Sequence, residues 1–400
     1  MKVYTTKLDV NAERKIIADD MVLTKDMPTA AGSKMLDGYM SLFDAEVLDR
    51  AKANGYTLCG KADVGEFAID LVGETSYNRR DSLEGKLTNA VADILATNDA
   101  EAALTLDANG SVRRAAAQSG LISIKPTYGT VSRYGMIPVA CSGDTVSVMA
   151  STVDSCRDLL YAIVGHDSKD GTSLPEELCA KSKKNADCAP VRKIAVIKTM
   201  LDGINEDVKA KIDTFCDTMQ KNGIEICEID NSVIPASRVA WNILMSAELC
   251  NNVSRYDGVK YGYRTQNFTN LDELYTNSRT EAFGEFLKTA IIFGSETLST
   301  ENYMKVYDKA LRTRRVIVEN FTAIFNEYDA VLMPACSTLE YTAEAVKENK
   351  YLPYEENLYT APASITGLPT VVVGGVQLVG KYFSENSLFG VASIFEKEGK

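Results

Sequence analysis

Segments typical of buried β-strands alternate along the chain with segments that have the periodicity of an amphipathic helix. In the clearest example, apolar runs at 193–197 and 224–229 flank residues 205–222, in which apolar side chains recur at helical spacing. This order predicts a β-α-β unit. Further strand-like runs occupy 102–106, 329–334 and 367–375. Because such alternation is typical of helices packed on a sheet, we expect an α/β protein with a central, mostly buried sheet.

The charge and the apolar content of the chain exclude several classes of protein. With 43 basic and 55 acidic residues the net charge is −12, so we expect no independent binding of nucleic acid. No window approaches 18 consecutive apolar residues, so we expect no membrane-spanning helix. The first 15 residues lack the apolar core of a secretory signal, which predicts a cytoplasmic protein whose nine cysteines are reduced.

The sequence contains one histidine, His166. One imidazole cannot form a histidine cluster for zinc, and we predict no metal site and no bound cofactor. His166 is also the one base that the sequence offers to a Ser-His or Cys-His enzyme. The alternative, which we favour, is a histidine at a helix C-terminus or in a loop, without a catalytic role.

Residues 168–191 differ in composition from the segments on either side. They are polar and charged, contain two prolines and show no apolar period. We predict that this stretch is a long surface connection.

The segment from 102 to 129 holds the strongest candidate for catalysis. A strand-like run leads through the turn residues 107–110 into an Ala- and Arg-rich helical stretch, which Gly120 ends. Ser111 therefore lies where a strand turns into a helix. A nucleophilic serine benefits from this position, because unpaired backbone N–H groups and the positive end of a helix dipole lie beside it. The alternative is a serine that only caps the helix, which is a common role for this residue.

Several motifs resemble those of the amidase signature family, in the same order along the chain. They are GKADVGEF at 60–67, DANGSVR at 107–113, KPTYG at 125–129, SRYDGVKYGYR at 254–264 and TAPASITGLPT at 360–370. Within that family they are most similar to the A subunits of glutamyl-tRNA(Gln) amidotransferases. The resemblance implies a single domain over residues 1–400, with three α/β/α layers around a large mixed sheet and without the family's usual N-terminal helical region. Residues 192–325 would form its less typical, insertion-like half.

Enzymes of this family cleave amides with a Ser–cis-Ser–Lys triad, in which a neutral lysine takes a proton through a bridging serine. The resemblance carries the nucleophile onto Ser111 and the oxyanion loop onto Ala108, Asn109 and Gly110. The family usually has a second glycine where Asn109 stands. We expect the turn to be preserved, because asparagine tolerates a left-handed backbone better than most residues.

The other two members of the triad are replaced in this sequence. A gapless count back from Ser111 puts the bridging serine at Leu87, and the hydroxyl of Thr88 is one residue out of register. The catalytic lysine falls on Asp19. Leucine cannot relay a proton, and aspartate has the wrong charge and a shorter reach than lysine.

The resemblance also implies that the pocket for the amide donor is altered. The family's paired arginine falls on Thr289 and Ala290, and the acidic residue that receives the substrate amino group falls on Asn357. Alanine cannot hold a carboxylate as arginine does. Together with Asp19 and Leu87, these positions predict a degenerate member without amidase activity.

Other residue types give weaker signals. Cys141 and Cys336 follow strand-like runs, but no base partners them, so we predict inert thiols. Trp241, in SRVAWNILM, is more typical of a core residue than of a stacking platform.

Three functions remain open. We favour a pseudoenzyme that works by binding, as a scaffold, assembly subunit or sensor, with a protein partner or a second copy of the chain, and with a small amide as its candidate ligand. The second is an amide or ester hydrolase with Ser111 as nucleophile and an unconventional base. The third is a working subunit of a tRNA-dependent amidotransferase, a carbon–nitrogen ligase whose amide donor is glutamine or another source of ammonia.

Overall fold

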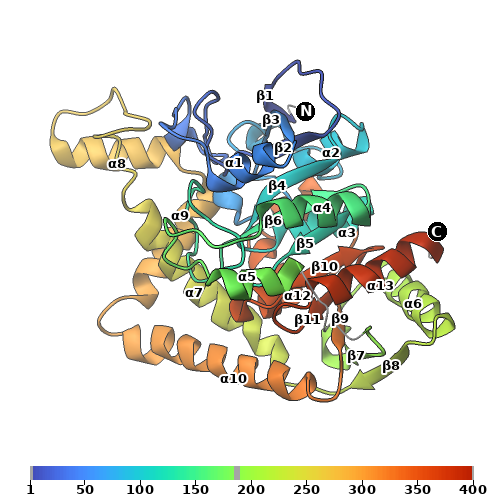
Figure 1. The fold of residues 1–400 in the computed structure, drawn as a ribbon. Helices are drawn as coiled ribbons and strands as arrows, with labels where there is room; N and C mark the ends of the chain where they lie inside the picture. Colours follow the sequence, from blue (N-terminus) through green and yellow to red (C-terminus); the bar gives the residue numbers. More distant parts are fainter. Residues whose placement is uncertain (1–2, 184–189, 399–400) are drawn as a thin grey trace.

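The computed structural model describes residues 3–183 and 190–398, and a mixed 11-stranded sheet forms its centre (Figure 1). The strands are β1 (Tyr4–Lys7), β2 (Lys15–Asp19), β3 (Thr57–Ala62), β4 (Ala102–Asp107), β5 (Ile122–Lys125), β6 (Thr145–Ala150), β7 (Lys193–Ile197), β8 (Glu225–Ile229), β9 (Ala330–Pro334), β10 (Thr370–Val373) and β11 (Val376–Gly380). Their order across the sheet is β1-β3-β2-β4-β6-β5-β10-β11-β9-β7-β8. β2 runs parallel to β3 and β4, β7 runs parallel to β8 and β9, and the other neighbours pair antiparallel.

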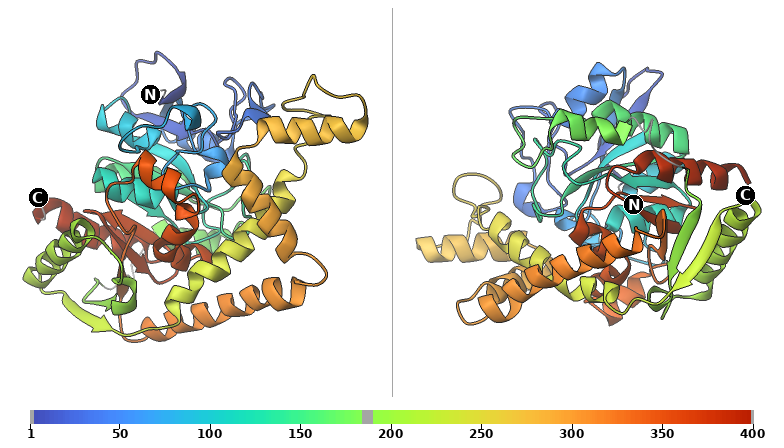
Figure 2. Two further views of the ribbon diagram at one scale, coloured as in Figure 1. Left: turned by 180° about the vertical axis from the view of Figure 1, so that it is seen from behind. Right: turned by 60° about the horizontal axis from the view of Figure 1, so that its bottom comes forward.

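Helices cover both faces of this sheet. They are α1 (Glu46–Ala53), α2 (Ala90–Ala96), α3 (Ser111–Ser119), α4 (Val153–Ile163), α5 (Glu176–Lys183), α6 (Glu206–Lys221), α7 (Ser237–Val253), α8 (Leu271–Ala282), α9 (Glu285–Thr297), α10 (Asp308–Ile324), α11 (Ala343–Glu348), α12 (Leu352–Thr366) and α13 (Glu385–Glu398). α4, α5 and α13 lie in front of the sheet in Figure 1, whereas α7 and α11 come forward in the view from behind (Figure 2, left). The central strands β4, β6 and β10 are buried along their whole length, as a sheet covered on both faces requires.

The predicted alternation of strands and helices is confirmed. β7, α6 and β8 form the β-α-β unit, with β7 and β8 paired in parallel from Lys193 opposite Glu225 to Ile197 opposite Ile229. β4, β9 and β10 occupy the other strand-like runs. The α/β class with a large mixed sheet is therefore the observed fold, and residues 192–325 contribute β7 and β8 to the same sheet as the N-terminal strands.

The stretch 168–191 is more ordered than the predicted surface connection. It contains α5, and the side chains of Cys179 and Ser182 on that helix are buried. Small residues such as these give little apolar periodicity, which is why the sequence did not indicate a helix. Residues 184–189 of this stretch lie outside the described residues.

α7 packs against both α9 and α10, and α8 projects from the body beyond α9 (Figures 1 and 2). Within residues 3–183 and 190–398, no helix combines the length and the apolar content that crossing a membrane requires.

Candidate active site

Ser111 is the first residue of α3, directly after the turn that leaves β4. The cap position belongs to Gly110, whose φ of 83° is left-handed, so the alternative that Ser111 caps the helix is wrong. A side chain at 110 would also collide with Thr360, because a Cβ there would lie 2.3 Å from the Thr360 Cβ. Ser111 is 5% exposed, and its hydroxyl makes no hydrogen bond within the described residues.

The predicted oxyanion loop is closed by contacts on the Asn109 side chain. Asn109 Nδ2 donates to the Ile69 carbonyl at 2.7 Å, and Asn109 Oδ1 accepts from the indole N–H of Trp241 at 3.0 Å. The Thr360 hydroxyl donates to the Asn109 carbonyl at 3.2 Å. Asn109 is not among the residues with positive φ, so Gly110 alone supplies the left-handed step, and Ala108 before it is fully buried.

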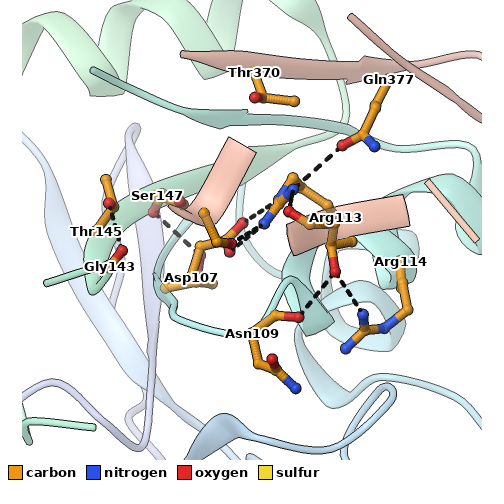
Figure 3. A network of polar contacts seen from close by, with 12 residues as sticks. Asp107, Asn109, Arg113, Arg114, Gly143, Thr145, Ser147, Thr370 and Gln377 are labelled. Carbon is orange, nitrogen blue, oxygen red and sulfur yellow. Dashed lines mark hydrogen bonds and ion pairs between the residues drawn. The ribbon is translucent and has the colours of Figure 1, made fainter. Parts of the chain in front are cut away.

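A buried ion pair fixes α3 against the sheet. Arg113 Nε and Nη2 lie 2.8 and 3.1 Å from the two carboxylate oxygens of Asp107, and both side chains are 0% exposed. The same guanidinium donates to Ser364 and Thr360 on α12 and to Gln377 on β11 (Figure 3). Two charges out of water are stable only with such complete pairing. A network with a structural role therefore holds Ser111 in place, and its presence is not evidence of catalysis.

Asp19, at the predicted lysine position, ends β2 and is 2% exposed. Its two oxygens accept from the backbone N–H groups of Met21 at 3.1 Å and Leu106 at 2.8 Å, so the carboxylate joins β2 to β4. Burial raises the pKa of Asp19 to about 7. The charge of Lys61 on β3 acts on Asp19, but its Nζ lies 2.8 Å from Asp20 and donates to Thr29. Neither group makes a hydrogen bond to Ser111.

The loop predicted to hold the bridging serine is used to start α2. Leu87 is 3% exposed and its N–H donates to the Tyr341 carbonyl at 2.8 Å. The Thr88 hydroxyl donates to Asp93 at 2.7 Å. Asn89 caps the helix, because its side chain accepts from the N–H of Ala92. The Thr88 hydroxyl, near the relay position, therefore has a partner in the first turn of α2 instead of a nucleophile.

The predicted positions of the amide-donor clamp lie on two helices. Ala290 is fully buried in α9, and Thr289 next to it turns its hydroxyl back to the Glu285 carbonyl. Asn357 is fully buried in α12, where its amide contacts Asn242 and lies within 3.3 Å of Asn109. The structure thus brings Asn357 to the oxyanion loop, while position 290 offers only a methyl group.

Two further residues belong to this region, and the sequence analysis did not predict a place for either of them there. Trp241, interpreted as a core residue, is 1% exposed, but its indole N–H also holds Asn109. Lys125, at the end of β5, is 1% exposed, and its Nζ makes no hydrogen bond within the described residues. Burial, with the nearby Arg113 charge, lowers the pKa of Lys125 to about 7. The place of Lys125 in the KPTYG motif could have identified it from the sequence. The contact between Trp241 and Asn109 could not have been identified, because 132 residues separate them.

None of the remaining candidates hydrogen-bonds Ser111 within the described residues. His166 is exposed in a loop, where its Nδ1 lies 3.0 Å from the Leu174 carbonyl oxygen. The eight cysteines in the described residues are all free, and burial raises the pKa of the Cys336 thiol. Cys188 lies outside the described residues. In the part of the chain that the structure describes, no three His, Cys, Asp or Glu side chains gather as a metal site would require.

Comparison with known proteins gives a consistent result. A family model described as Amidase matches residues 17–89 and 90–389. The A subunit of glutamyl-tRNA(Gln) amidotransferase from Streptococcus pneumoniae serotype 19F (strain G54) is 34% identical over 397 residues, which cover 94% of this chain and 81% of the relative. The protein of the same name from Acinetobacter baumannii (strain AB0057) is also 34% identical, over 399 residues.

Solved structures share the fold. The crystal structure of the A subunit of glutamyl-tRNA(Gln) amidotransferase from Thermotoga maritima matches with a TM-score of 0.80 and 25% identity, covering 99% of this chain and 87% of that one. A component of an unexpected vestigial protein complex, related to the origins of an s-triazine catabolic enzyme, matches with a TM-score of 0.77 and 22% identity over 98% of this chain and 85% of that one. The second likeness shows the fold alone.

Proposed function

The chain belongs to the amidase family, and on that premise we propose that it is a catalytically inactive member that works by binding, as a scaffold or assembly subunit. The observation that carries the proposal is the isolation of Ser111. Its hydroxyl makes no hydrogen bond to a base or a relay in the described residues, although the turn and helix around it are in place. A nucleophilic serine needs an adjacent base to be activated.

The two positions that matter most for this proposal have acquired structural contacts. The Asp19 carboxylate is occupied by two backbone N–H groups, and Leu87 is part of the apolar core. General acid–base catalysis contributes about 10²- to 10⁴-fold to a rate, and an aligned electrostatic group adds a few kcal/mol. Loss of the base, the relay and the arginine at 290 together supports a rate below detection.

A protein partner or a second copy of the chain is part of the proposal. The relatives are named as subunits, and one structural neighbour was found in a protein complex. Because a net charge of −12 disfavours binding of nucleic acid by this chain alone, it supports a protein as the partner. The free thiols of the described cysteines support a reducing compartment, the cytoplasm.

The test is a turnover screen with the full chain and Ser111→Ala side by side. Primary amides, glutamine and activated esters are offered, and released ammonia or alcohol is measured. The proposal predicts equal, background-level release from both proteins. Turnover by the unaltered chain that disappears in Ser111→Ala would overturn it.

The second candidate is a Ser111-dependent hydrolase, and one observation favours it. Lys125 is a buried amine with a pKa lowered to about 7, so part of it is neutral and able to accept a proton. No hydrogen bond links Lys125 to Ser111 within the described residues. If the screen shows turnover, loss of that turnover in Lys125→Met would identify the base.

The third candidate is a working component of an amidotransferase, and the printed names of the relatives favour it. It requires partner subunits that bind this chain. A pull-down with the full chain from its own cells, in which the bound proteins include no other amidotransferase component, would remove its support.

A further inference from the structure

A cavity of about 360 Å³ lies between the C-terminal part of α10 and the end of α12, and the segment that follows β11 forms its rim. Phe321, Phe325 and Leu368 belong to its wall, and all three side chains are buried. A concave, mainly apolar site of this size is typical of a small-molecule pocket. At about 30 Å³ for a water-sized group, the volume holds a ligand of roughly a dozen non-hydrogen atoms.

Three hydroxyl groups of the cavity wall already have acceptors inside the fold. The Thr322 hydroxyl donates to the Val318 carbonyl at 2.9 Å, and the Thr366 hydroxyl donates to the Pro362 carbonyl at 2.6 Å. The Tyr382 hydroxyl donates to the Thr366 carbonyl at 2.7 Å. Because each hydroxyl proton already has an acceptor, none of these three groups needs a ligand to satisfy it.

The charge of the cavity comes from Lys381. No Asp or Glu lies among its described lining residues, and the Lys381 ammonium makes no hydrogen bond or ion pair within residues 3–183 and 190–398. The positive charge of Arg314 acts on Tyr382, the next residue of the lining. Asn326, the remaining polar residue of the lining, is exposed, and its amide both donates and accepts, so it favours neither sign of charge. The cavity is therefore positive in a chain whose net charge is −12.

An apolar wall with one unpaired cation restricts the ligands that fit. A neutral ligand would bury its apolar part but leave the ammonium without a partner, and a ligand ammonium would meet a like charge. A phosphate monoester carries about two negative charges, which a single lysine does not balance. A carboxylate carries one negative charge, and an ammonium donates to it in a short, charge-assisted hydrogen bond.

We propose that this cavity is a binding site for an amphipathic monocarboxylate whose apolar body is the size of one ring with a short chain. The body packs on Phe321, Phe325 and Leu368, and the carboxylate accepts from the Lys381 ammonium. This assignment goes beyond the proposed function, because neither Ser111 nor the other residues of the candidate active site line the cavity.

The first experiment compares three probes of similar shape with the full chain at neutral pH, by ligand-observed NMR titration. Phenylbutyrate, phenylbutanol and phenylbutylamine share an apolar body, and their head groups are negative, neutral and positive. Phenylbutyrate is expected to bind at least about tenfold more tightly than phenylbutanol, about 1.4 kcal/mol, and phenylbutylamine more weakly than phenylbutanol. Absence of phenylbutyrate binding, or equal binding of phenylbutanol, overturns the proposal.

Two substitutions then test the location. Lys381→Met removes the charge and keeps an apolar stem, so phenylbutyrate is expected to bind at least about tenfold more weakly while phenylbutanol binds as before. Val318→Trp fills the cavity, so both probes are expected to bind at least about tenfold more weakly. Lys309→Met is the control, because Lys309 is an exposed lysine of α10 that does not line the cavity, and it should change neither affinity. Unchanged phenylbutyrate binding in Lys381→Met or Val318→Trp, each checked for folding by circular dichroism, overturns the assignment.

The same titration separates this site from the candidate active site and from the proposed function. Ser111→Ala is expected to bind phenylbutyrate as the unaltered chain does, and a tenfold weaker affinity there would place the ligand beside Ser111 and overturn the cavity assignment. Failure of phenylbutyrate to bind would remove the cavity assignment and leave the non-catalytic role standing.

Discussion

Two regions of this molecule correspond, in our proposal, to parts of one catalytic arrangement, and their contacts differ. In the nucleophile turn, β4, Gly110, Ser111 and α3 retain the geometry that a reactive serine requires. In the region that we propose corresponds to the base and the relay, the Asp19 carboxylate accepts from two backbone N–H groups and Leu87 is part of the apolar core. The first region resembles an active site, and the second resembles an ordinary protein core.

The difference follows from what each residue does for folding. Arg113 and Asp107, beside the serine, connect α3 to β4, β11 and α12, so their loss would damage the fold as well as any reaction. A lysine and a bridging serine whose role is proton transfer can be replaced without that cost. Preservation of the nucleophile turn is therefore weak evidence for catalysis. Substitutions in each region can show whether that region is now structural.

The largest predicted effect is the loss of the buried pair in the nucleophile turn. Arg113→Met leaves the Asp107 carboxylate buried without its partner, and we expect a loss of about 3–5 kcal/mol in the free energy of unfolding. Urea denaturation measures it. Arg315→Met is the control, because its ion pair with Glu319 is exposed and should contribute little. Equal losses in both variants would show that the turn is not a structural centre.

The next effect tests the relay region. Leu87→Ser introduces the residue type of the proposed relay but puts a hydroxyl into an apolar site, so we expect a loss of about 2–4 kcal/mol in stability and no gain in amide turnover. Leu42→Ser, at a side chain that is 95% exposed, is the matched control and should leave stability unchanged. A stable Leu87→Ser variant that hydrolyses amides would break the comparison.

A smaller effect is expected where α7 meets the nucleophile turn. Trp241→Phe removes the indole N–H and leaves Asn109 Oδ1 buried without that donor, so we expect a loss of about 1–3 kcal/mol. Faster amide hydrogen exchange at residues 108–110 would locate the effect. Tyr354→Phe also removes one polar atom from an aromatic ring, but its partner is Ser246, so exchange at the turn should not change. Similar exchange in both variants would argue against the clamp on Asn109.

The last predicted effect is a dependence of the free energy of unfolding on pH. The pKa of Asp19 is raised to about 7 in the folded protein, chiefly by burial, so the folded state holds this proton more tightly than the unfolded chain does. The resulting stabilisation is present at low pH and is lost as pH rises from about 4 to about 7. Relative to Asp19→Asn, the unaltered protein should lose at most about 1.4 kcal/mol per pH unit in this window, and nothing further above it. A stability difference that does not vary with pH would contradict the burial of an ionisable group at position 19.

The sequence predicted the parts of the fold that local patterns encode. β7, α6 and β8 follow from apolar periodicity, and Ser111 at the start of α3 follows from a strand, a turn and an Ala-rich helix in succession. α5 was missed because its buried residues, Cys179 and Ser182, are small.

Contacts between distant segments were beyond any local pattern. Trp241 reaches Asn109 across 132 residues, and Gly284 reaches Glu66 across 218. Both contacts depend on how α7 and α9 pack, which no short stretch of sequence specifies. The place of Ser111 at the start of α3 was therefore predictable, whereas the hydrogen bonds around the candidate site were not.

The reactivity of Ser111 tests the central claim most directly. The full chain is incubated with a fluorophosphonate, which forms a covalent adduct with activated serines, and intact-mass spectrometry measures the adduct, with Ser111→Ala as the control. We predict no adduct at Ser111, because no base or relay hydrogen-bonds its hydroxyl in the described residues. A stoichiometric adduct that peptide mapping assigns to Ser111, and that is absent from Ser111→Ala, would contradict the account.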